Sequence, residues 1–444
     1  MSIQKITGAP RSLHLHGGRI IDPANRRDEI GDLYLHEGKI ADPARLPEVA
    51  WEKIDLKGKI VTPGLIDVHV HLREPGGSAK ETIRTGTRAA AAGGFTSVVA
   101  MPNTKPVADG TNTIAWIRQK AASEAVVNVF PTGAISVGSE GEMLAPIGSL
   151  KKAGVVAITD DGRCIQNNEL MRRALEYATM FDLPVLDHCQ DMALTADGVV
   201  HEGYWSTVLG LRGWPAIAEE IIVGRNALLA ELTGATVLCQ HLSSAGSVRL
   251  VREAKQRGVK IHGEAMPHHL LLTDDSLPGY DTNYKMNPPL RTERDRQALL
   301  EGVADGTIEV LASDHAPHAR FEKEVEFDRA PFGIIGLETE LPVFIKALIE
   351  PKVIDWPTLV SRLTIEPARI LRLDRLGTAA EPGPAKGTLT PGRDADVTVI
   401  DPGREWVVAA EEFESLSRNC PFDKMPLRGR AVLTIVGGQI VWAL

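Results

Sequence analysis

Short apolar segments alternate with helix-length amphipathic segments through the middle of the chain, from residue 59 to residue 369. Short apolar strands separated by amphipathic helices are typical of βα units that build a parallel sheet. Eight such segments predict an α/β fold in the form of a (β/α)8 TIM-type barrel. A doubly wound open sheet is disfavoured, because no G-x-G-x-x-G motif follows the first segment. The eight segments are GLIDVHVHL, TSVVAMP, VVNVFPTGAI, VVAITDDG, LPVLDHC, TVLCQHLS, KIHGEAMPHHL and TIEVLASDHAPH.

The two ends of the chain follow a different pattern. Residues 1–58 contain short apolar stretches such as LHLHGGRII and DLYLHEGKI, separated by glycine and aspartate turns. Residues 370–444 contain similar stretches, among them REWVV and AVLTIVGGQIVW. Strand-rich ends that flank a long α/β region predict one small β-sandwich domain built from 1–58 and 370–444, beside a barrel of residues 59–369.

Composition narrows the class of partner. The chain has 444 residues, of which 43% are hydrophobic and 24% charged, and its net charge is −9. This balance predicts neither nucleic acid nor an anionic membrane as a partner. It says little about a small-molecule substrate, because a site can carry local positive charge on an acidic protein. The sequence contains no run of about 18 apolar residues, so no membrane span is expected. The first residues include no apolar segment of the kind that a signal peptide needs. The four scattered cysteines form no C-x-x-C pair, which favours the reducing cytoplasm.

Chemically capable side chains stand at the polar ends of these strands, which converge on one rim of a barrel. His69 and His71 end the first segment. Residues i and i+2 face the same side of a strand, so both imidazoles are expected inside the barrel, with Val68 and Val70 facing the helices. Their backbones then stand about 6.6 Å apart, which lets two imidazoles reach one metal ion. Two hydrogen-bonded core histidines are the simpler alternative for an isolated H-x-H.

Two more histidines and two carboxylates complete a mixed ligand set. His188 and His241 close apolar strands, and each alone is more typical of a core histidine. Together with H-x-H they supply four imidazoles, and Asp161 and Asp314 add oxygen ligands, which is enough for two metal ions. Asp314 could instead cap the following turn. Its place at the last strand favours a metal ligand that also transfers a proton, the catalytic acid and base.

Arg73 comes two residues after His71, so both side chains are expected on the same side of the extended chain. Arg73 is therefore expected to reach past the metal toward the substrate. A guanidinium there would bind a carboxylate through paired hydrogen bonds. Asn103 and Asn287 are further candidates for binding amide or carboxylate groups. These residues predict a metal-activated water that attacks a polar carbonyl in a substrate with an anionic group. Peptide, ester, lactone and cyclic amide substrates all fit this description.

A set of motifs resembles one family along essentially the whole chain. PGLIDVHVHLREPG, GGFTSVVAMPNTKP, DDG, DHC, EAMPHHLLLTDD, KMNPPLR, SDHAPH and APFGIIGLE occur in this order. They resemble the amidohydrolase superfamily and, within it, the class I dihydroorotases of pyrimidine biosynthesis. The H-x-H motif marks only the superfamily, whereas its combination with HLREPG, MPNT and NPPLR is more specific.

The resemblance implies a reaction and a role for each site residue. The reaction is the reversible hydrolysis of (S)-dihydroorotate to N-carbamoyl-L-aspartate, with zinc as the cofactor, one or two ions per subunit. It also implies a homodimer and leaves association with aspartate transcarbamoylase open. The implied first-metal ligands are His69, His71 and Asp314, the second-metal ligands are His188 and His241, the bridging carboxylate is Asp161, the catalytic residue is Asp314, and the substrate-binding positions are His71, Arg73, Asn103, Asn287, His318, Phe332 and Gly333.

Two alternatives stay open. Hydantoinases, allantoinases and class II dihydroorotases resemble this family but bridge their metals with a carbamylated lysine, and VVAITDDG has no lysine at its end. A non-catalytic subunit that supports aspartate transcarbamoylase would have lost metal ligands, whereas all six positions are filled here. The charged segment 319–331 is expected to be either a mobile loop over the site or an ordinary surface loop.

Overall fold

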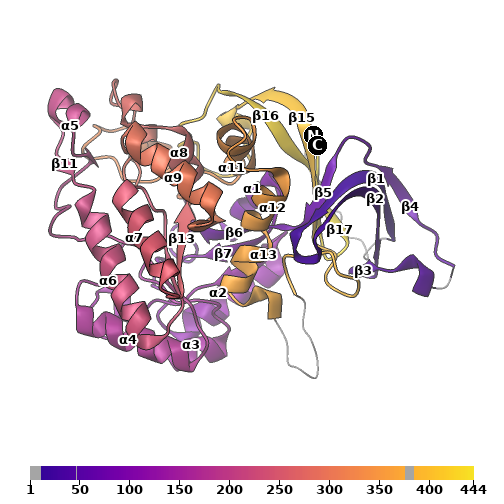
Figure 1. The fold of residues 1–444 in the computed structure, drawn as a ribbon, viewed down its shortest axis with the longest axis horizontal. Helices are drawn as coiled ribbons and strands as arrows, with labels where there is room; N and C mark the ends of the chain where they lie inside the picture. The colour runs from indigo at the N-terminus through magenta and orange to yellow at the C-terminus, as the bar shows by residue number, and fades with distance from the viewer. Residues whose placement is uncertain (1–11, 47, 376–384) are drawn as a thin grey trace.

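A computed structural model describes residues 12–46, 48–375 and 385–444. Parallel strands from the middle of the chain form two sheets, with helices α4, α6 and α7 to the left of them in Figure 1. One sheet has the order β6 (Leu65–Val70), β7 (Phe95–Ala100) and β8 (Asn128–Pro131); the other has the order β14 (Ile308–Leu311), β13 (Ile261–Ala265), β12 (Val237–Cys239) and β9 (Val185–Asp187).

Isolated parallel bridges connect the two sheets at both of their edges. Val70 bridges His315, which joins β6 to the segment after β14. On the other edge Ile158 bridges both Gly133 and Val185. The prediction of a fourth strand over VVAITDDG is therefore wrong in its extent, because only Ile158 pairs on both sides. The segment still lies between β8 and β9 and exchanges backbone hydrogen bonds with both neighbours.

Helices follow most of the parallel strands, as the alternating pattern predicts. The helix after β6, α1 (Ile83–Gly93), is capped by Thr82, whose hydroxyl accepts a hydrogen bond from the Thr85 amide, and by Gly94 at its other end. Gly94 has a φ of 96°, which residues other than glycine rarely adopt. A Cβ at this position would also stand 2.8 Å from the Cβ of Ala431, so the close approach requires glycine as well. The helices are α1 (Ile83–Gly93), α2 (Thr111–Glu124), α3 (Ile147–Ala153), α4 (Asn168–Met180), α5 (Tyr204–Leu209), α6 (Ile217–Thr233), α7 (Ala245–Gln256), α8 (Pro267–Leu271), α9 (Glu293–Asp305), α10 (Arg320–Lys323), α11 (Glu340–Phe344), α12 (Trp356–Leu363) and α13 (Ile365–Ile370).

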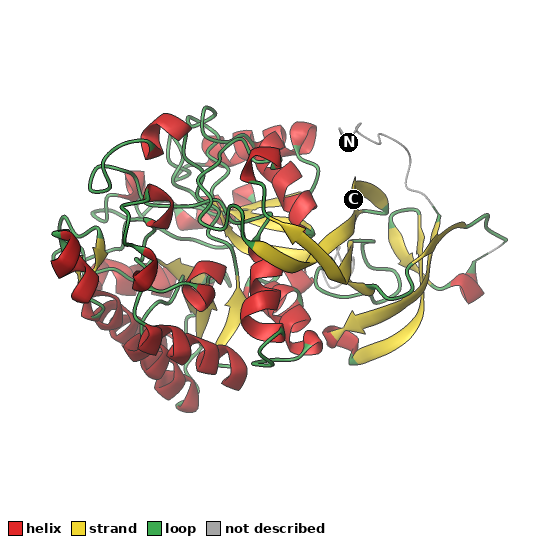
Figure 2. Ribbon diagram, turned by 90° about the horizontal axis from the view of Figure 1, so that it is seen from above, coloured by secondary structure: helices red, strands yellow, loops and turns green. Residues whose placement is uncertain are grey.

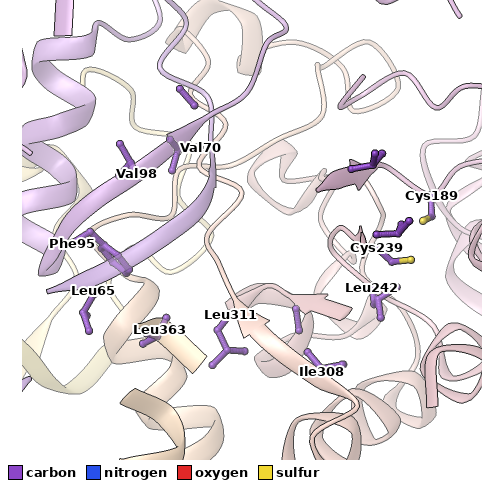
Figure 3. Packing of buried hydrophobic residues seen from close by; sticks show 14 of the residues in the cluster. Leu65, Val70, Phe95, Val98, Cys189, Cys239, Leu242, Ile308, Leu311 and Leu363 are labelled. Atoms are coloured by element: carbon purple, nitrogen blue, oxygen red, sulfur yellow. The ribbon is translucent and has the colours of Figure 1, made fainter. Parts of the chain in front are cut away.

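Two apolar clusters lie on the two sides of the parallel strands. The larger cluster joins strand residues such as Leu65, Val70 and Val98 to residues of the surrounding helices (Figure 3). The smaller cluster joins residues of several strands to residues at and after α13, among them Val68. Val70 therefore faces the helices as predicted, but the same prediction for Val68 is wrong. The pairing of β6 with β7 shifts register between Asp67 and Val70, which interrupts the alternation of sides.

Both ends of the chain build one eight-stranded sheet, visible on the right in Figures 1 and 2. Its own apolar cluster contains Leu13, Leu35, Val397 and Ile435. The division at residues 58/59 and 369/370 stays a prediction, and β5 belongs to this sheet by its hydrogen bonds. The strands are β1 (Leu13–Asp22), β2 (Arg27–His36), β3 (Lys39–Ala41), β4 (Glu52–Asp55), β5 (Ile60–Pro63), β15 (Val397–Val407), β16 (Pro426–Val436) and β17 (Gln439–Ala443), while β10 (Val200–His201) and β11 (Gly213–Trp214) pair separately.

No helix of the described residues is long and apolar enough to cross a membrane.

Candidate active site

The six predicted metal ligands come together at the carboxyl ends of the parallel strands. Each of their residues is at most 9% exposed. Strand ends of a parallel barrel-like array meet on one rim, which explains how residues more than 200 positions apart become neighbours. The set comprises His69 in β6, His71 just after it, Asp161 after the Ile158 bridge, His188 after β9, His241 after β12 and Asp314 after β14.

Asp161 stands at the centre of this set. Its Oδ1 lies 3.3 Å from Nε2 of His69, 3.6 Å from Nδ1 of His188 and 3.8 Å from Nε2 of His241. Its Oδ2 lies 3.4 Å from Nε2 of His71. One carboxylate thus faces all four imidazoles, three through Oδ1 and one through Oδ2.

Asp314 faces only the first pair of histidines. Its Oδ1 lies 3.0 Å from Nε2 of His71 and 3.4 Å from Nε2 of His69. Oδ2 makes no hydrogen bond with any residue in the described ranges. The carboxylate therefore has one oxygen among the imidazoles and a second that is free to exchange a proton.

Three imidazoles make a hydrogen bond through the ring nitrogen that points away from the cluster, and this bond determines which nitrogen carries the proton in the neutral ring. His69 Nδ1 lies 2.9 Å from Oε1 of Glu264, and His71 Nδ1 lies 2.9 Å from Oδ1 of Asn103. His188 Nε2 lies 2.7 Å from Oε1 of Gln190. Each partner oxygen accepts the imidazole N–H, so in the neutral form of each ring the opposite nitrogen presents its lone pair to the centre of the cluster. This is how ligand histidines are held in metalloproteins.

The electrostatics of the cluster are strongly coupled. Burial alone would lower the pKa of His69, but Asp314, Asp161 and Glu264 outweigh it and hold that pKa well above its usual value. Burial would raise the pKa of Asp161, but the surrounding imidazoles hold it well below its usual range. The two aspartates are therefore carboxylates at neutral pH, and positive charge is favoured between them.

The residues fit a metal ion. His69 Nε2 is buried and has no hydrogen-bond partner among the described residues, and Nδ1 of His188 faces Nε2 of His241 at 2.7 Å. A buried nitrogen without a partner is costly, and two imidazole nitrogens at 2.7 Å need a proton or a cation between them. Two triads have all their ligand atoms within 4.8 Å of one another: His69, His71 and Asp314, and His69, Asp161 and His241. The N/O donor set suits a borderline divalent ion.

Backbone strain accompanies the ligands. Arg73, His241 and Asp314 have positive φ values of 60°, 35° and 48°. Residues other than glycine rarely adopt this conformation, and it is typically kept where function requires it. All three side chains line the same cavity.

One cavity of about 350 Å³ gathers the remaining predicted site residues. Among the six ligands only His69 is absent from its lining. The cavity lining includes His71, Arg73, Asn103, Asp161, His188, His241, Asn287, Asp314, His318, Phe332 and Gly333.

Comparison with known proteins identifies the family of this chain. The family model described as Dihydro-orotase-like matches residues 58–247. The chain is 51% identical over 433 residues to the protein named Dihydroorotase of Geotalea daltonii, covering 97% of this chain and 99% of that one. It is also 51% identical over 430 residues to the Dihydroorotase of Pelotomaculum thermopropionicum, covering 97% and 98%. The chain belongs to the dihydroorotase family.

Solved structures place the family's fold among the hydantoinases. The L-hydantoinase of Arthrobacter aurescens matches with a TM-score of 0.85 at 24% identity, covering 98% of this chain and 96% of that one. The D-hydantoinase of a Bacillus sp. AR9 matches with a TM-score of 0.82 at 25% identity, covering 97% and 95%. At this identity the likeness concerns the fold and not the substrate.

Sequence reasoning about this family member did not identify Glu264 and Gln190, which orient His69 and His188. Gln190 follows His188 by two residues, and this spacing could have indicated that the two side chains lie on the same side of the chain. Glu264 lies inside β13, where a polar residue has no local signal of function.

Segment 319–331 is neither a free surface loop nor detached from the cavity. Lys323 is 6% exposed, and its Nζ lies 3.0 Å from the carbonyl oxygen of Pro331 and 3.1 Å from that of Gly333. Lys285 Nζ lies 2.8 Å from the carbonyl oxygen of Phe327 and 4.7 Å from the centre of the Phe332 ring. Two ammonium groups thus fasten the segment to the wall of the cavity.

Proposed function

We propose that the chain catalyses the reversible hydrolysis of (S)-dihydroorotate to N-carbamoyl-L-aspartate, which runs toward ring closure in pyrimidine biosynthesis. The observation that carries this proposal is the shared cavity, in which Arg73 stands beside the metal-ligand cluster and Asp161 occupies its centre. A cyclic amide with a carboxylate matches both features. The two relatives named Dihydroorotase support the same substrate.

We propose zinc as the metal, with one or two ions per chain. His69, His71 and Asp314 would hold one ion, His188 and His241 the second, and Asp161 would bridge them. A bound divalent ion would supply an acidified water molecule and would polarise the carbonyl under attack. Glu264, Asn103 and Gln190 keep the imidazole protons away from the centre, so the ligand nitrogens need no rearrangement on binding.

The free donors and acceptors around the cavity match the substrate. Arg73 uses Nε for the carbonyl oxygen of Pro317 at 3.1 Å, and its two Nη groups have no partner in the described part of the chain. Paired N–H groups of this kind bind a carboxylate through two hydrogen bonds.

Two buried acceptors stand ready for the N–H groups of the ring. Oδ1 of Asn287 and Nδ1 of His318 have no hydrogen-bond partner among the described residues. Burial and the charge of Arg73 lower the pKa of His318 to about 3, so its imidazole is neutral. Nε2 lies 2.8 Å from the carbonyl oxygen of Phe332 and donates to it, which leaves Nδ1 as the acceptor. The backbone at Phe332 and Gly333 forms the wall on which the ring would lie.

Asp314 would move the proton. In hydrolysis, water adds to the ring carbonyl and the carbon–nitrogen bond breaks. Asp314 would take one proton from the attacking water through Oδ2 and return it to the departing ring nitrogen, which becomes the NH2 of the carbamoyl group. In ring closure the same carboxylate would remove that proton from the NH2 group and give it to the oxygen that leaves as water.

A coupled assay of carbamoyl-aspartate cyclisation tests the proposal, before chelation, after chelation and after zinc is restored. We expect activity that chelation abolishes and zinc restores. Dihydroorotate, hydantoin and allantoin are assayed side by side, and turnover of hydantoin alone would replace the proposal with a hydantoinase. A metal-free protein without chelator-sensitive activity would indicate a non-catalytic partner of aspartate transcarbamoylase.

We also propose a homodimer, which the family resemblance implies, and a cytoplasmic location, which the scattered cysteines favour. The resemblance leaves association with aspartate transcarbamoylase open. Size-exclusion chromatography with light scattering, with and without the transcarbamoylase, measures the oligomeric state and the association.

A further inference from the structure

Outside the cavity, a second cluster of metal-ligating side chains lies on the sheet built from the chain ends. His14 and His16 stand on β1 and Asp32 on the neighbouring strand β2. None of the three lines the cavity described above. Their ligand atoms all lie within 4.8 Å of one another.

The pairing of β1 with β2, which includes a bulge, brings these residues together. Leu15 pairs with Leu33 and Gly18 with Gly31, so two residues of β1, His16 and Gly17, stand opposite one residue of β2. Gly17 has a φ of 72°, which a bulge at this position requires and glycine allows. His14 and His16 share one side of β1 because they are two residues apart, and the bulge places both His16 and Gly17 opposite Asp32.

The cluster is fixed before any ligand arrives. Oδ2 of Asp32 lies 2.9 Å from Nε2 of His14, and Oδ1 lies 2.9 Å from Nδ1 of His16. The backbone N–H of Gly17 donates to the same Oδ1 at 3.0 Å. The ring of His14 stacks on Tyr34 with 4.4 Å between centroids. Little conformational entropy is therefore left to lose when a ligand binds.

The chemistry of the three groups suits a transition-metal ion. A neutral imidazole carries its proton on either nitrogen, so Nε2 of His14 and Nδ1 of His16 become lone-pair donors by a change of tautomer. Two imidazole nitrogens and one carboxylate oxygen form an N/O set preferred by borderline divalent ions. The side chains of His14, His16 and Asp32 are 16%, 32% and 32% exposed, which leaves room for water as a further ligand.

We propose that His14, His16 and Asp32 bind one borderline divalent ion, such as Zn²⁺ or Ni²⁺, at a second metal site separate from the catalytic cavity. The proposal does not depend on the proposed reaction. It has a direct consequence for that reaction, since a count of zinc per chain includes this ion and overstates the occupancy of the cavity by one.

The test uses the full-length protein, stripped with a chelator and equilibrated by dialysis against buffered Zn²⁺, with metal and protein counted in the same sample. The double variant H14A/H16A is compared with wild type and with H36A. His36 is a matched control, because it lies on β2, bonds to Ser12 and contacts Trp51 outside the cluster.

We expect H14A/H16A to bind one equivalent less than wild type and H36A, with dihydroorotase-type activity retained as a check on the fold. Equal counts in all three proteins would overturn the proposal. If the double variant does not fold, H16Q replaces it, and an unchanged zinc titration curve for H16Q against wild type would overturn the proposal equally.

Discussion

The Nδ1 nitrogen of His69 lies 2.9 Å from Oε1 of Glu264, and both side chains are fully buried. The same carboxylate oxygen accepts the backbone N–H of His241 at 3.2 Å. One glutamate from β13 thus orients an imidazole of β6 and the backbone of a second ligand after β12. Carboxylates in this position fix the tautomer of a ligand histidine and raise its basicity.

The first prediction concerns this carboxylate. Glu264→Gln keeps the volume but weakens the acceptor, so the affinity for zinc is expected to fall about 10- to 100-fold. Competition with a chromophoric chelator measures it. Glu309→Gln is the matched control, because Glu309 is also a mostly buried glutamate that bonds to a histidine, His262, but lines no part of the cavity. Equal losses in the two variants would show a general effect on the fold.

Asp314→Asn tests the proton transfer. The amide is nearly isosteric but cannot accept and return a proton, so kcat is expected to fall about 10²- to 10⁴-fold for both hydrolysis and ring closure. Both directions are measured at saturating substrate. Zinc is counted in the same preparation, because Asp314 also faces the first pair of histidines. A variant that keeps its metal and loses less than ten-fold in kcat would rule out the proposed role.

Arg73 is predicted to act through the substrate carboxylate. Hydrogen bonds to a charged group contribute about 1.5–3 kcal/mol, so Arg73→Gln should raise the KM for dihydroorotate about 10- to 100-fold. Arg73→Lys keeps the charge but loses the paired geometry, and an intermediate KM is expected. Dihydrouracil, the same ring without its carboxylate, provides the control: its slow turnover should hardly differ between wild type and Arg73→Gln.

The residues predicted for the site come together in the structure, whereas one strand of the predicted sheet is shorter than expected. His69, His188 and Asp314 could be found because parallel strands end on one rim, and a polar residue after an apolar strand is visible locally. The strand expected over VVAITDDG was wrong in its extent, since its neighbours pair with it only through Ile158. The side on which Val68 lies depends on a register shift between β6 and β7. Such a shift arises from the pairing of two strands, so the sequence of one strand does not indicate it.

The charged segment 319–331 shows a second limit. Its composition gave equal support to a mobile loop and to an ordinary surface loop. In the structure Lys323 is buried and bonded to carbonyl oxygens at both ends of the Pro331–Gly333 wall. A lysine is normally exposed, so nothing local distinguishes this one. Its burial depends on carbonyl groups that come together around the ammonium only when the chain has folded.

The buried ammonium of Lys323 leads to a prediction about pH. Burial, together with the nearby charge of Lys285, lowers the pKa of Lys323 from 10.5 to about 7 in the folded protein. Between pH 7 and pH 10.5 the unfolded chain holds this proton and the folded protein releases it. The unfolded state then binds more protons, so this residue makes the free energy of unfolding rise with pH across that window.

Lys323→Met removes the titrating group and keeps most of the volume. The difference in unfolding free energy, wild type minus variant, is therefore expected to increase by about 1–3 kcal/mol between pH 7 and pH 9.5, measured by urea denaturation. Taking this difference cancels the other groups that titrate in the same range. Lys120→Met is the control, because Lys120 lies on the surface helix α2 and pairs only with Glu124. A constant difference for Lys323→Met would mean that the ammonium keeps its proton throughout, held by the carbonyl oxygens of the cavity wall.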